Sequence, residues 1–325
     1  MRRWLGRAFA LLGAVALVGW VGSRLLRPPA RPAFHPADPL LRAQPLYFYP
    51  AAGASRSAPR AVVFFFGNDV GFWRAHQELA ERLAGAGYGV VGFDMRPMLA
   101  RLPESPPAAR DSAFLLRIAP LVARSRRALG GTGRPLVLGG HSVGAELALW
   151  TASRLRPSGL VGVLALSPGV RGHLRVTLSD IAEGPEPTEA GSFAVAEAVR
   201  ALAPAVRVAV VRGASDKYGG GDAALVAAGA RRFVIPFAGH ALRRLLIAGP
   251  VIESALAWLV SQPPASPGLA SVRHRDGRPR AGSRHGLAAF AATTAAESSG
   301  ARRKATARAM PSGRVAASRP CRCPG

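Results

Sequence analysis

Residues 135–145 read Pro-Leu-Val-Leu-Gly-Gly-His-Ser-Val-Gly-Ala. A short apolar run at 135–139 precedes a Gly-x-Ser-x-Gly motif, and apolar residues at helical spacing follow from 145 to 155. This order predicts a strand, a sharp turn and a helix, with Ser142 at the apex of the turn. Glycines at 140 and 144 suit such a turn, because the backbones pass too close for side chains there. Ser142 is therefore a candidate nucleophile, and the backbone amide of Val143 is a candidate donor to a developing oxyanion.

Strands and helices are predicted to alternate on both sides of this motif. Besides 135–139, apolar runs rich in β-branched and aromatic residues predict strands at 61–66, 89–93, 159–166, 206–211 and 232–235. Helices are predicted at 73–83, 112–129, 145–155 and 242–260. This alternation is typical of the α/β class, a mostly parallel, doubly wound sheet with helices on both faces.

A serine hydroxyl needs a general base, and the base needs a carboxylate that orients it. Asp216 follows the predicted strand 206–211, and His240 follows the strand 232–235. Both should lie at the same sheet edge as Ser142, in the chain order Ser, acid, His. We therefore predict Ser142 as nucleophile, His240 as general base and Asp216 as acid, with Asp222 as the alternative acid.

Each of these residues also has a simpler interpretation. Ser142 could be a helix N-cap, Asp216 a turn former, and His240 a surface residue at a helix start. All three interpretations would have to hold together, at the right chain order and sheet edge. His141 is expected to point away from Ser142 and is left out of the predicted triad.

The loop after the first buried strand, Phe66-Gly-Asn-Asp69, is expected to supply the second oxyanion donor. The backbone amide of Asn68 is the candidate. The alternative is a plain turn in which Asp69 caps the following helix.

Composition argues against cofactor and metal chemistry. The sequence has no P-loop lysine, no dinucleotide fingerprint and no His-Glu-x-x-His motif. Both cysteines, Cys321 and Cys323, stand in the tail and are too few for a structural zinc site. We expect neither a cofactor nor a metal.

The chain is strongly basic, with 43 Lys or Arg against 18 Asp or Glu and a net charge of +25. Such a charge favours anionic partners, either nucleic acid or lipid headgroups. No nucleic-acid recognition module is present, so nucleic acid is not the expected partner.

The N-terminus has the architecture of a signal sequence. Arg2, Arg3 and Arg7 precede an uncharged apolar run at 8–22. We predict that residues 1–27 are a signal-anchor or a signal peptide, with membrane contact through residues 4–26. By the positive-inside rule the chain would be anchored in a bacterial inner membrane facing the periplasm, or be periplasmic if the segment is cleaved. The alternative is a buried N-terminal helix of a soluble protein.

Three further segments complete the predicted organisation. Residues 28–60 form a Pro-rich tether and the entry to the domain, 61–260 form the domain, and 261–325 form a basic, low-complexity tail predicted to be disordered.

Over about 61–260 the chain resembles the α/β-hydrolase superfamily. The stretches 66–73 and 83–94 look like the bacterial virulence-protein VirJ/AcvB group, and the resemblance also touches 140–145 and 174–180. That group is associated with periplasmic hydrolysis of lysyl-phosphatidylglycerol. This chain departs from the group's pattern around the serine, with His141, Val143 and Glu146.

The resemblance and the motif together predict a serine hydrolase that cleaves a carboxylic ester through an acyl-enzyme. Aminoacyl-phosphatidylglycerol, an anionic aminoacylated phospholipid, is the specific candidate substrate. Residues 170–205 lie where such folds insert lids, and Glu183, Glu186 and Glu189 there could face a cationic aminoacyl group. The alternatives are a non-catalytic envelope module assisting secretion or virulence, and a generic periplasmic esterase or thioesterase.

Overall fold

The structure, a computed structural model, describes residues 32, 34–53, 58–182, 184–217, 221–240, 242 and 245–261. The chain divides into the units Met1–Ser266 and Pro267–Gly325, and all described residues belong to the first. The predicted membrane segment 1–27 and, except for Ser261, the predicted tail lie outside the described residues. Among the helices that are described, none is long and apolar enough to cross a membrane.

The main sheet has seven strands in the order β1-β3-β2-β4-β5-β8-β9. All neighbours pair in parallel except β1 and β3, which are antiparallel. The bounds are β1 Leu46–Tyr49, β2 Val62–Phe66, β3 Gly89–Phe93, β4 Leu136–His141, β5 Leu160–Leu166, β8 Arg207–Gly213 and β9 Arg231–Ile235. The predicted α/β class with a mostly parallel sheet is confirmed.

The sheet begins earlier in the chain than the expected boundary at residue 61. Leu46-Tyr-Phe-Tyr49 forms the edge strand β1, which pairs with β3 from Leu46↔Phe93 to Tyr49↔Val90. The segment 28–60 is therefore more than a tether. An edge strand with only half of its residues buried lacks the continuous apolar run that marked the central strands.

The central strands are apolar throughout because each contributes to two cores. Along β2, Val62, Phe64 and Phe66 belong to one core, whereas Val63 and Phe65 belong to the other. Successive side chains of a strand point to opposite faces, so a strand covered on both sides must be hydrophobic at every position.

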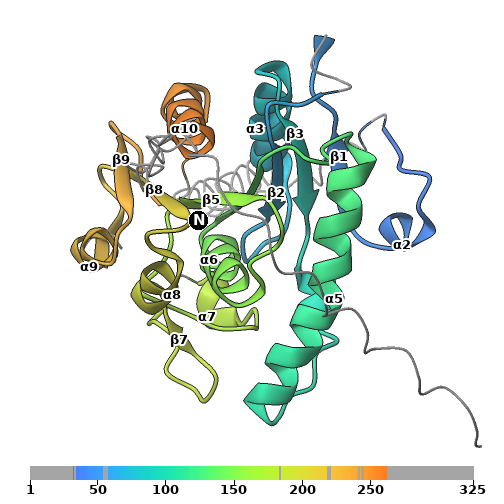
Figure 1. Cartoon of the computed structure of the whole chain (residues 1–325). Helices are drawn as coiled ribbons and strands as arrows, with labels where there is room; N and C mark the ends of the chain where they lie inside the picture. Colours follow the sequence, from blue (N-terminus) through green and yellow to red (C-terminus); the bar gives the residue numbers. More distant parts are fainter. Residues whose placement is uncertain are drawn as a thin grey trace, which may run out of the picture. The chain divides into compact units, whose positions relative to one another are not determined.

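Helices cover the sheet on both faces (Figure 1). The core of one face includes residues of α5, α6 and α8, and the core of the other includes residues of α3 and α10. The helix bounds are α2 Pro39–Arg42, α3 Arg74–Gly85, α4 Arg96–Leu99, α5 Pro107–Ala128, α6 Val143–Leu155, α7 Leu178–Ile181, α8 Val195–Leu202, α9 Asp222–Ala227 and α10 Leu245–Val260.

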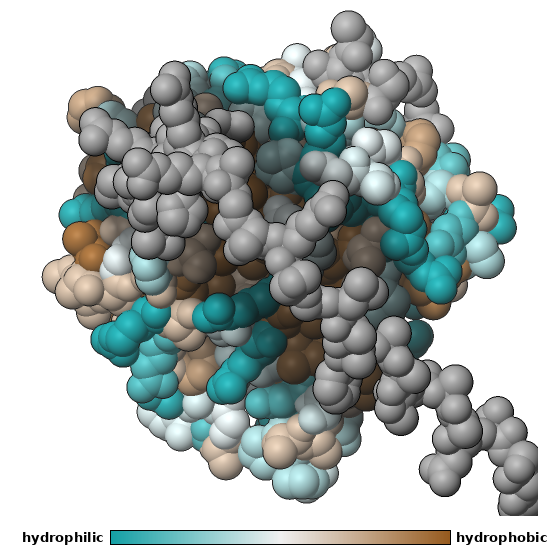
Figure 2. Space-filling view, in the orientation of Figure 1, coloured by the Kyte–Doolittle hydropathy of each residue, from teal (hydrophilic) through white to brown (hydrophobic). Residues whose placement is uncertain are grey.

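An insertion between β5 and β8 carries a second, two-stranded sheet. Its strands β6 (Arg171–Gly172) and β7 (Phe193–Ala194) pair antiparallel, and α7 lies between them in the chain. This is the region where the sequence predicts a lid. On the face drawn in Figure 2, hydrophobic residues are visible in recessed parts between hydrophilic ones.

Candidate active site

Ser142 stands at the turn between β4 and α6. Its backbone has φ 54° and ψ −125°, a conformation that non-glycine residues rarely adopt and that marks functional sites. A Cβ on Gly140 would overlap the backbone of Gly144, and one on Gly144 would overlap the carbonyl oxygen of Gly67. The Gly-x-Ser-x-Gly motif is thus placed as the sequence indicates, with the two glycines permitting the close approach.

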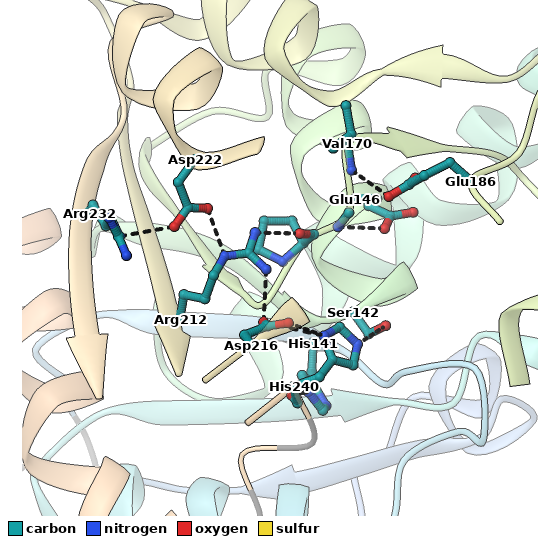
Figure 3. A network of polar contacts seen from close by, with 12 residues as sticks. His141, Ser142, Glu146, Val170, Glu186, Arg212, Asp216, Asp222, Arg232 and His240 are labelled. Atoms are coloured by element: carbon teal, nitrogen blue, oxygen red, sulfur yellow. Dashed lines mark hydrogen bonds and ion pairs between the residues drawn. The ribbon is translucent and has the colours of Figure 1, made fainter. Parts of the chain in front are cut away.

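The structure brings Ser142, Asp216 and His240 together from three separate loops (Figure 3). His240 Nε2 lies 3.0 Å from Ser142 Oγ. Its other ring nitrogen, Nδ1, lies 3.3 Å and 3.4 Å from the two carboxylate oxygens of Asp216. One tautomer satisfies both contacts, since Nδ1–H donates to Asp216 while Nε2 accepts the serine proton.

Asp222, the alternative acid, lies elsewhere. It begins α9 and accepts a hydrogen bond from Arg212 Nε at 2.7 Å, while Arg232 Nε forms an ion pair with it at 3.0 Å. The structure records no contact between Asp222 and His240 among the described residues, and Asp216 holds that place.

Arg212 separates the two carboxylates. Its side chain is 1% exposed, and its Nη1 donates to Asp216 Oδ2 at 2.8 Å. Its Nη2 donates to the carbonyl oxygen of Pro168 at 2.6 Å. A buried charge with paired hydrogen bonds on each side fixes the orientation of the carboxylates it contacts. Sequence reasoning missed this residue, although an arginine directly after the apolar run Val208–Val211 of the same strand was a visible signal.

Two further histidines, His141 and His76, continue the hydrogen bonding from the backbone of His240. His141 Nε2 is 3.1 Å from the backbone oxygen of His240, and His141 Nδ1 is 3.1 Å from His76 Nε2. Burial lowers the pKa of His141 to about 4, and the neighbouring imidazole of His240 lowers it further. Burial also lowers the pKa of His76 well below its usual range, and the imidazole of His141 acts in the same direction. Both rings are therefore neutral near pH 7. His141 stays outside the contacts to Ser142, as expected, while His76 was not anticipated.

Because each neutral ring has one donor and one acceptor nitrogen, the hydrogen bonds from His76 to His240 can run in only one direction. The His240 carbonyl can only accept, so His141 carries its proton on Nε2 and accepts at Nδ1 from His76 Nε2–H. The Trp73 amide then donates to His76 Nδ1, at 3.5 Å. This chain links the start of α3 to the backbone of His240.

The two predicted oxyanion donors differ in their surroundings. Val143 is the first residue of α6, where backbone amides have no carbonyl four residues before them within the helix. The Asn68 amide instead donates to the carbonyl oxygen of Gly71 at 3.2 Å, in a short bridge that Gly71 returns at 2.9 Å. In this structure the expected second donor is therefore already engaged.

The insertion is attached to α6 through Glu146. This residue is 6% exposed, and its Oε1 accepts from the Gly169 amide at 2.9 Å. Burial raises the pKa of Glu146 to about 8, and the neighbouring Glu186 carboxylate contributes in the same direction. This raised pKa favours the protonated form of Glu146 at neutral pH.

Most contacts of the acidic residues Glu186 and Glu189 are with other residues of the insertion. Glu186 accepts from the amides of Val170 and Arg171, both at 3.0 Å, and Glu189 contacts His173 Nδ1. Burial opposes the charge on His173, yet its contacts with Asp180 and Glu189 raise its pKa overall. Glu183 lies outside the described residues. The carboxylates of Glu186 and Glu189 are therefore already engaged within the insertion. A cationic substrate, which they were expected to face, would compete with these contacts.

The described residues contain no group of three or more His, Cys, Asp or Glu arranged to hold a metal ion.

The strand order, the strained turn at Ser142 and the order Ser, Asp, His along the chain define an α/β-hydrolase fold. No family model matches the sequence, and no curated protein matches it. Among solved structures, the chain is similar to a putative dienelactone hydrolase from Klebsiella pneumoniae (18% identity, 67% of this chain and 93% of that chain, TM-score 0.48). It is also similar to Est1E from Butyrivibrio proteoclasticus (14%, 67% and 94%, TM-score 0.48) and to a monoacylglycerol lipase from Paleococcus ferrophilus (16%, 66% and 97%, TM-score 0.44). At these identities and TM-scores the similarities assign no activity to this chain.

Proposed function

We propose that this chain is a serine hydrolase that cleaves carboxylic esters through an acyl-enzyme on Ser142. The observation that carries the proposal is the imidazole of His240, which contacts Ser142 Oγ through Nε2 and Asp216 through Nδ1. A nucleophile, a base and an orienting carboxylate within hydrogen-bond reach form the arrangement that acyl transfer requires.

The reaction proceeds in two halves. Ser142 Oγ attacks the ester carbonyl carbon while its proton passes to His240 Nε2, and the carbonyl oxygen becomes an oxyanion. The carbon–oxygen bond to the alcohol then breaks, and the leaving alcohol takes the proton from His240. Water attacks the acyl-enzyme in the same way and releases the carboxylic acid and Ser142. Asp216 stabilises the imidazolium that forms in each half.

The oxyanion receives the Val143 amide as its first donor in this proposal. The Asn68 amide becomes the second donor only if its bond to Gly71 gives way when substrate binds, since catalytic hydrogen bonds often tighten in the substrate complex. Each oxyanion donor is expected to be worth about 10²–10³ in kcat.

Aminoacyl-phosphatidylglycerol in the bacterial envelope remains the specific substrate proposed. The resemblance at 66–73 and 83–94, the basic charge of the chain and the apolar segment 8–22 support a lipid ester. Placement in the inner membrane, facing the periplasm, belongs to the same proposal.

The test is ester hydrolysis by the purified full chain and its Ser142→Ala variant. We expect the native chain to release p-nitrophenol from p-nitrophenyl butyrate with an initial burst stoichiometric with enzyme, and the variant to lose this activity. Vesicles containing lysyl-phosphatidylglycerol are tested beside soluble lysyl esters. Hydrolysis of soluble esters alone would favour a generic esterase over the lipid hydrolase.

A further inference from the structure

A cavity of about 460 Å³ lies between α4, the start of α5 and the insertion. Three arginines, Arg96, Arg110 and Arg175, are among the residues that line it. Glu104 supplies a carboxylate, and Leu99 and Leu174 are among its apolar neighbours. This volume is in the range of sites for small molecules.

Arg110 is an unusual component of the wall. The residue is only 4% exposed, and its Nε donates to the carbonyl oxygen of Pro103 at 3.0 Å. Its Nη2 is shielded from water and donates to no acceptor among the described residues. A buried donor without a partner has lost its hydrogen bonds to water without replacement, and the loss is greater when the group is charged. An arginine kept in this state is therefore short of an acceptor.

The residues that line the cavity include three arginines and one acidic residue, Glu104. Burial lowers the pKa of Arg110 and the charge of Arg175 lowers it further, although arginine remains protonated. Within the described part of the chain, neither Arg110 nor Arg175 forms an ion pair, whereas Arg96 is paired with Asp94 through bonds of 2.9 Å and 2.7 Å. The carboxylates of Asp111, Glu104 and Glu189 partly offset the charge of Arg110, and Arg175 Nη2 donates to the backbone oxygen of Glu104 at 3.0 Å.

The loop after β2 links the cavity to the candidate active site. The Arg96 guanidinium packs against Gly71, so closely that a Cβ there would overlap it. Gly71 is bonded to Asn68, and Gly67 of the same loop packs against Gly144 in the turn of Ser142. The opposite wall, from Leu174 to Thr177, belongs to the insertion that Glu146 holds through Gly169. Both walls of the cavity are thereby tied to α6.

We propose that this cavity is a subsite for an anionic group of the ester substrate. That group is either a phosphate or a carboxylate. The guanidinium groups of Arg110 and Arg175 bind the anion, with the Arg110 fork turning slightly to offer Nη2. Guanidinium forks match phosphate and carboxylate in geometry, and such charge-assisted bonds are stronger than neutral ones. The assignment to substrate rests on the proposed function, whereas anion binding itself does not.

Binding is measured first and without catalysis. Inorganic phosphate is titrated by calorimetry into the full chain carrying Ser142→Ala, with and without Arg110→Met. Arg127→Met, an exposed arginine of the same helix outside the cavity, is the matched control for the loss of one positive charge. We expect Arg110→Met to weaken phosphate binding about tenfold or more and Arg127→Met to leave it unchanged. Equal affinities in all three proteins would overturn the anion site.

Arg175→Met provides a second variant, because Arg175 is exposed and its loss should not disturb folding. It should weaken phosphate binding about threefold to tenfold. An unchanged affinity in a folded Arg175→Met protein, together with a misfolded Arg110→Met protein, would also overturn the proposal.

Catalysis then tests whether the site serves the substrate. The native chain should have a higher kcat/KM for mono-p-nitrophenyl adipate, which carries a terminal carboxylate, than for the neutral p-nitrophenyl hexanoate. Arg110→Met should remove this preference mainly through a higher KM for the adipate ester, whereas Arg127→Met should keep both the preference and the hydrolysis of hexanoate. A preference retained in Arg110→Met would overturn the substrate role. If neither ester is hydrolysed, the proposed function fails and the phosphate titration still decides the site.

Inhibition of adipate-ester hydrolysis distinguishes the two sources of the anion, a lipid headgroup and a soluble substrate. Inhibition by phosphatidylglycerol vesicles that is relieved by Arg110→Met but not by Arg127→Met would support a lipid headgroup. Inhibition by inorganic phosphate alone, relieved in the same way, would support a soluble substrate. Inhibition that Arg110→Met does not relieve would contradict the site.

Discussion

Arg212 lies between the two aspartates that the sequence offers as acids for His240. Its guanidinium contacts Asp216 and Asp222 at once, through different nitrogens. Asp222 is also paired with Arg232, while Asp216 retains an oxygen at 3.3 Å from His240 Nδ1. From the sequence both aspartates were open, because the loop after β8 could place either one near the histidine. The choice depends on a contact between side chains that no local pattern encodes.

Substituting the two aspartates should therefore have unequal effects. Asp216→Asn should lower kcat by roughly 10⁴, since loss of the orienting carboxylate costs about that much in a serine triad. Asp222→Asn should lower kcat by less than about tenfold, because it acts only through Arg212. Ester hydrolysis by the two purified variants, with circular dichroism as a check on folding, measures the difference. Equal losses would contradict the assignment of Asp216.

Glu146 should give the stability of the chain a specific pH dependence. Its pKa is raised by burial to about 8, above the value of about 4.5 for an exposed glutamate, so folding takes up a proton between these pH values. The contribution of Glu146 to stability is therefore fully present below about pH 4.5 and is lost as the pH rises towards 8, at about 1.4 kcal/mol per pH unit.

Glu146→Gln should remove this loss, because glutamine keeps an acceptor for the Gly169 amide without a titrating charge. Urea unfolding at pH 5 and pH 8 tests it. Relative to the native chain, the variant should gain stability at pH 8 but little at pH 5. A stability difference that is the same at both pH values would show that Glu146 does not titrate as described.

At the scale of elements, the sequence predicted the strands that consist of continuous, buried apolar runs. Strand β3 has the predicted bounds of 89–93, and β2, β4, β5, β8 and β9 begin within a residue of the expected positions. Edge strand β1 was missed, because a strand buried on half of its positions resembles a loop in sequence. His76 was also missed, since nothing within α3 announces a partner 65 residues away.

The contact between α6 and the loop after β2 is the element-level feature on which the site depends. A Cβ on Gly144 would overlap the Gly67 carbonyl, so Gly144→Ala must push the loop and the Ser142 turn apart. We expect Gly144→Ala to lower kcat/KM at least about 100-fold and to destabilise the fold by about 1–3 kcal/mol. Gly85→Ala, where an added Cβ meets nothing, is the control and should be neutral or slightly stabilising. Activity close to that of the native chain in Gly144→Ala would contradict the described turn.

At the scale of the whole molecule, charge is the property that sequence states most directly. The net charge is +25, and the residues from Pro263 onward carry twelve Lys or Arg against two acidic residues. The organisation of the chain outside 32–261 remains a prediction from composition, and so does its membrane placement. Substrate identity was equally beyond reach, because the arginines of the proposed anion site come from α4, α5 and the insertion and meet only in the folded domain.

The tail should contribute to binding of anionic membranes. The full chain and a chain ending at Gln262 are compared by cosedimentation with phosphatidylglycerol vesicles at 50 mM and 500 mM salt. We expect weaker binding of the shortened chain at low salt and a smaller difference at high salt, because salt screens exposed charges. Equal binding at low salt would remove the tail from the account.

The most direct test of the central claim is labelling of the full chain with a fluorophosphonate probe, which reacts with activated serines. The native chain should be labelled at one site, mapped to Ser142 by mass spectrometry, and both Ser142→Ala and His240→Ala should lose the label. A folded native chain that resists labelling and hydrolyses no ester would contradict the account and favour a non-catalytic envelope module.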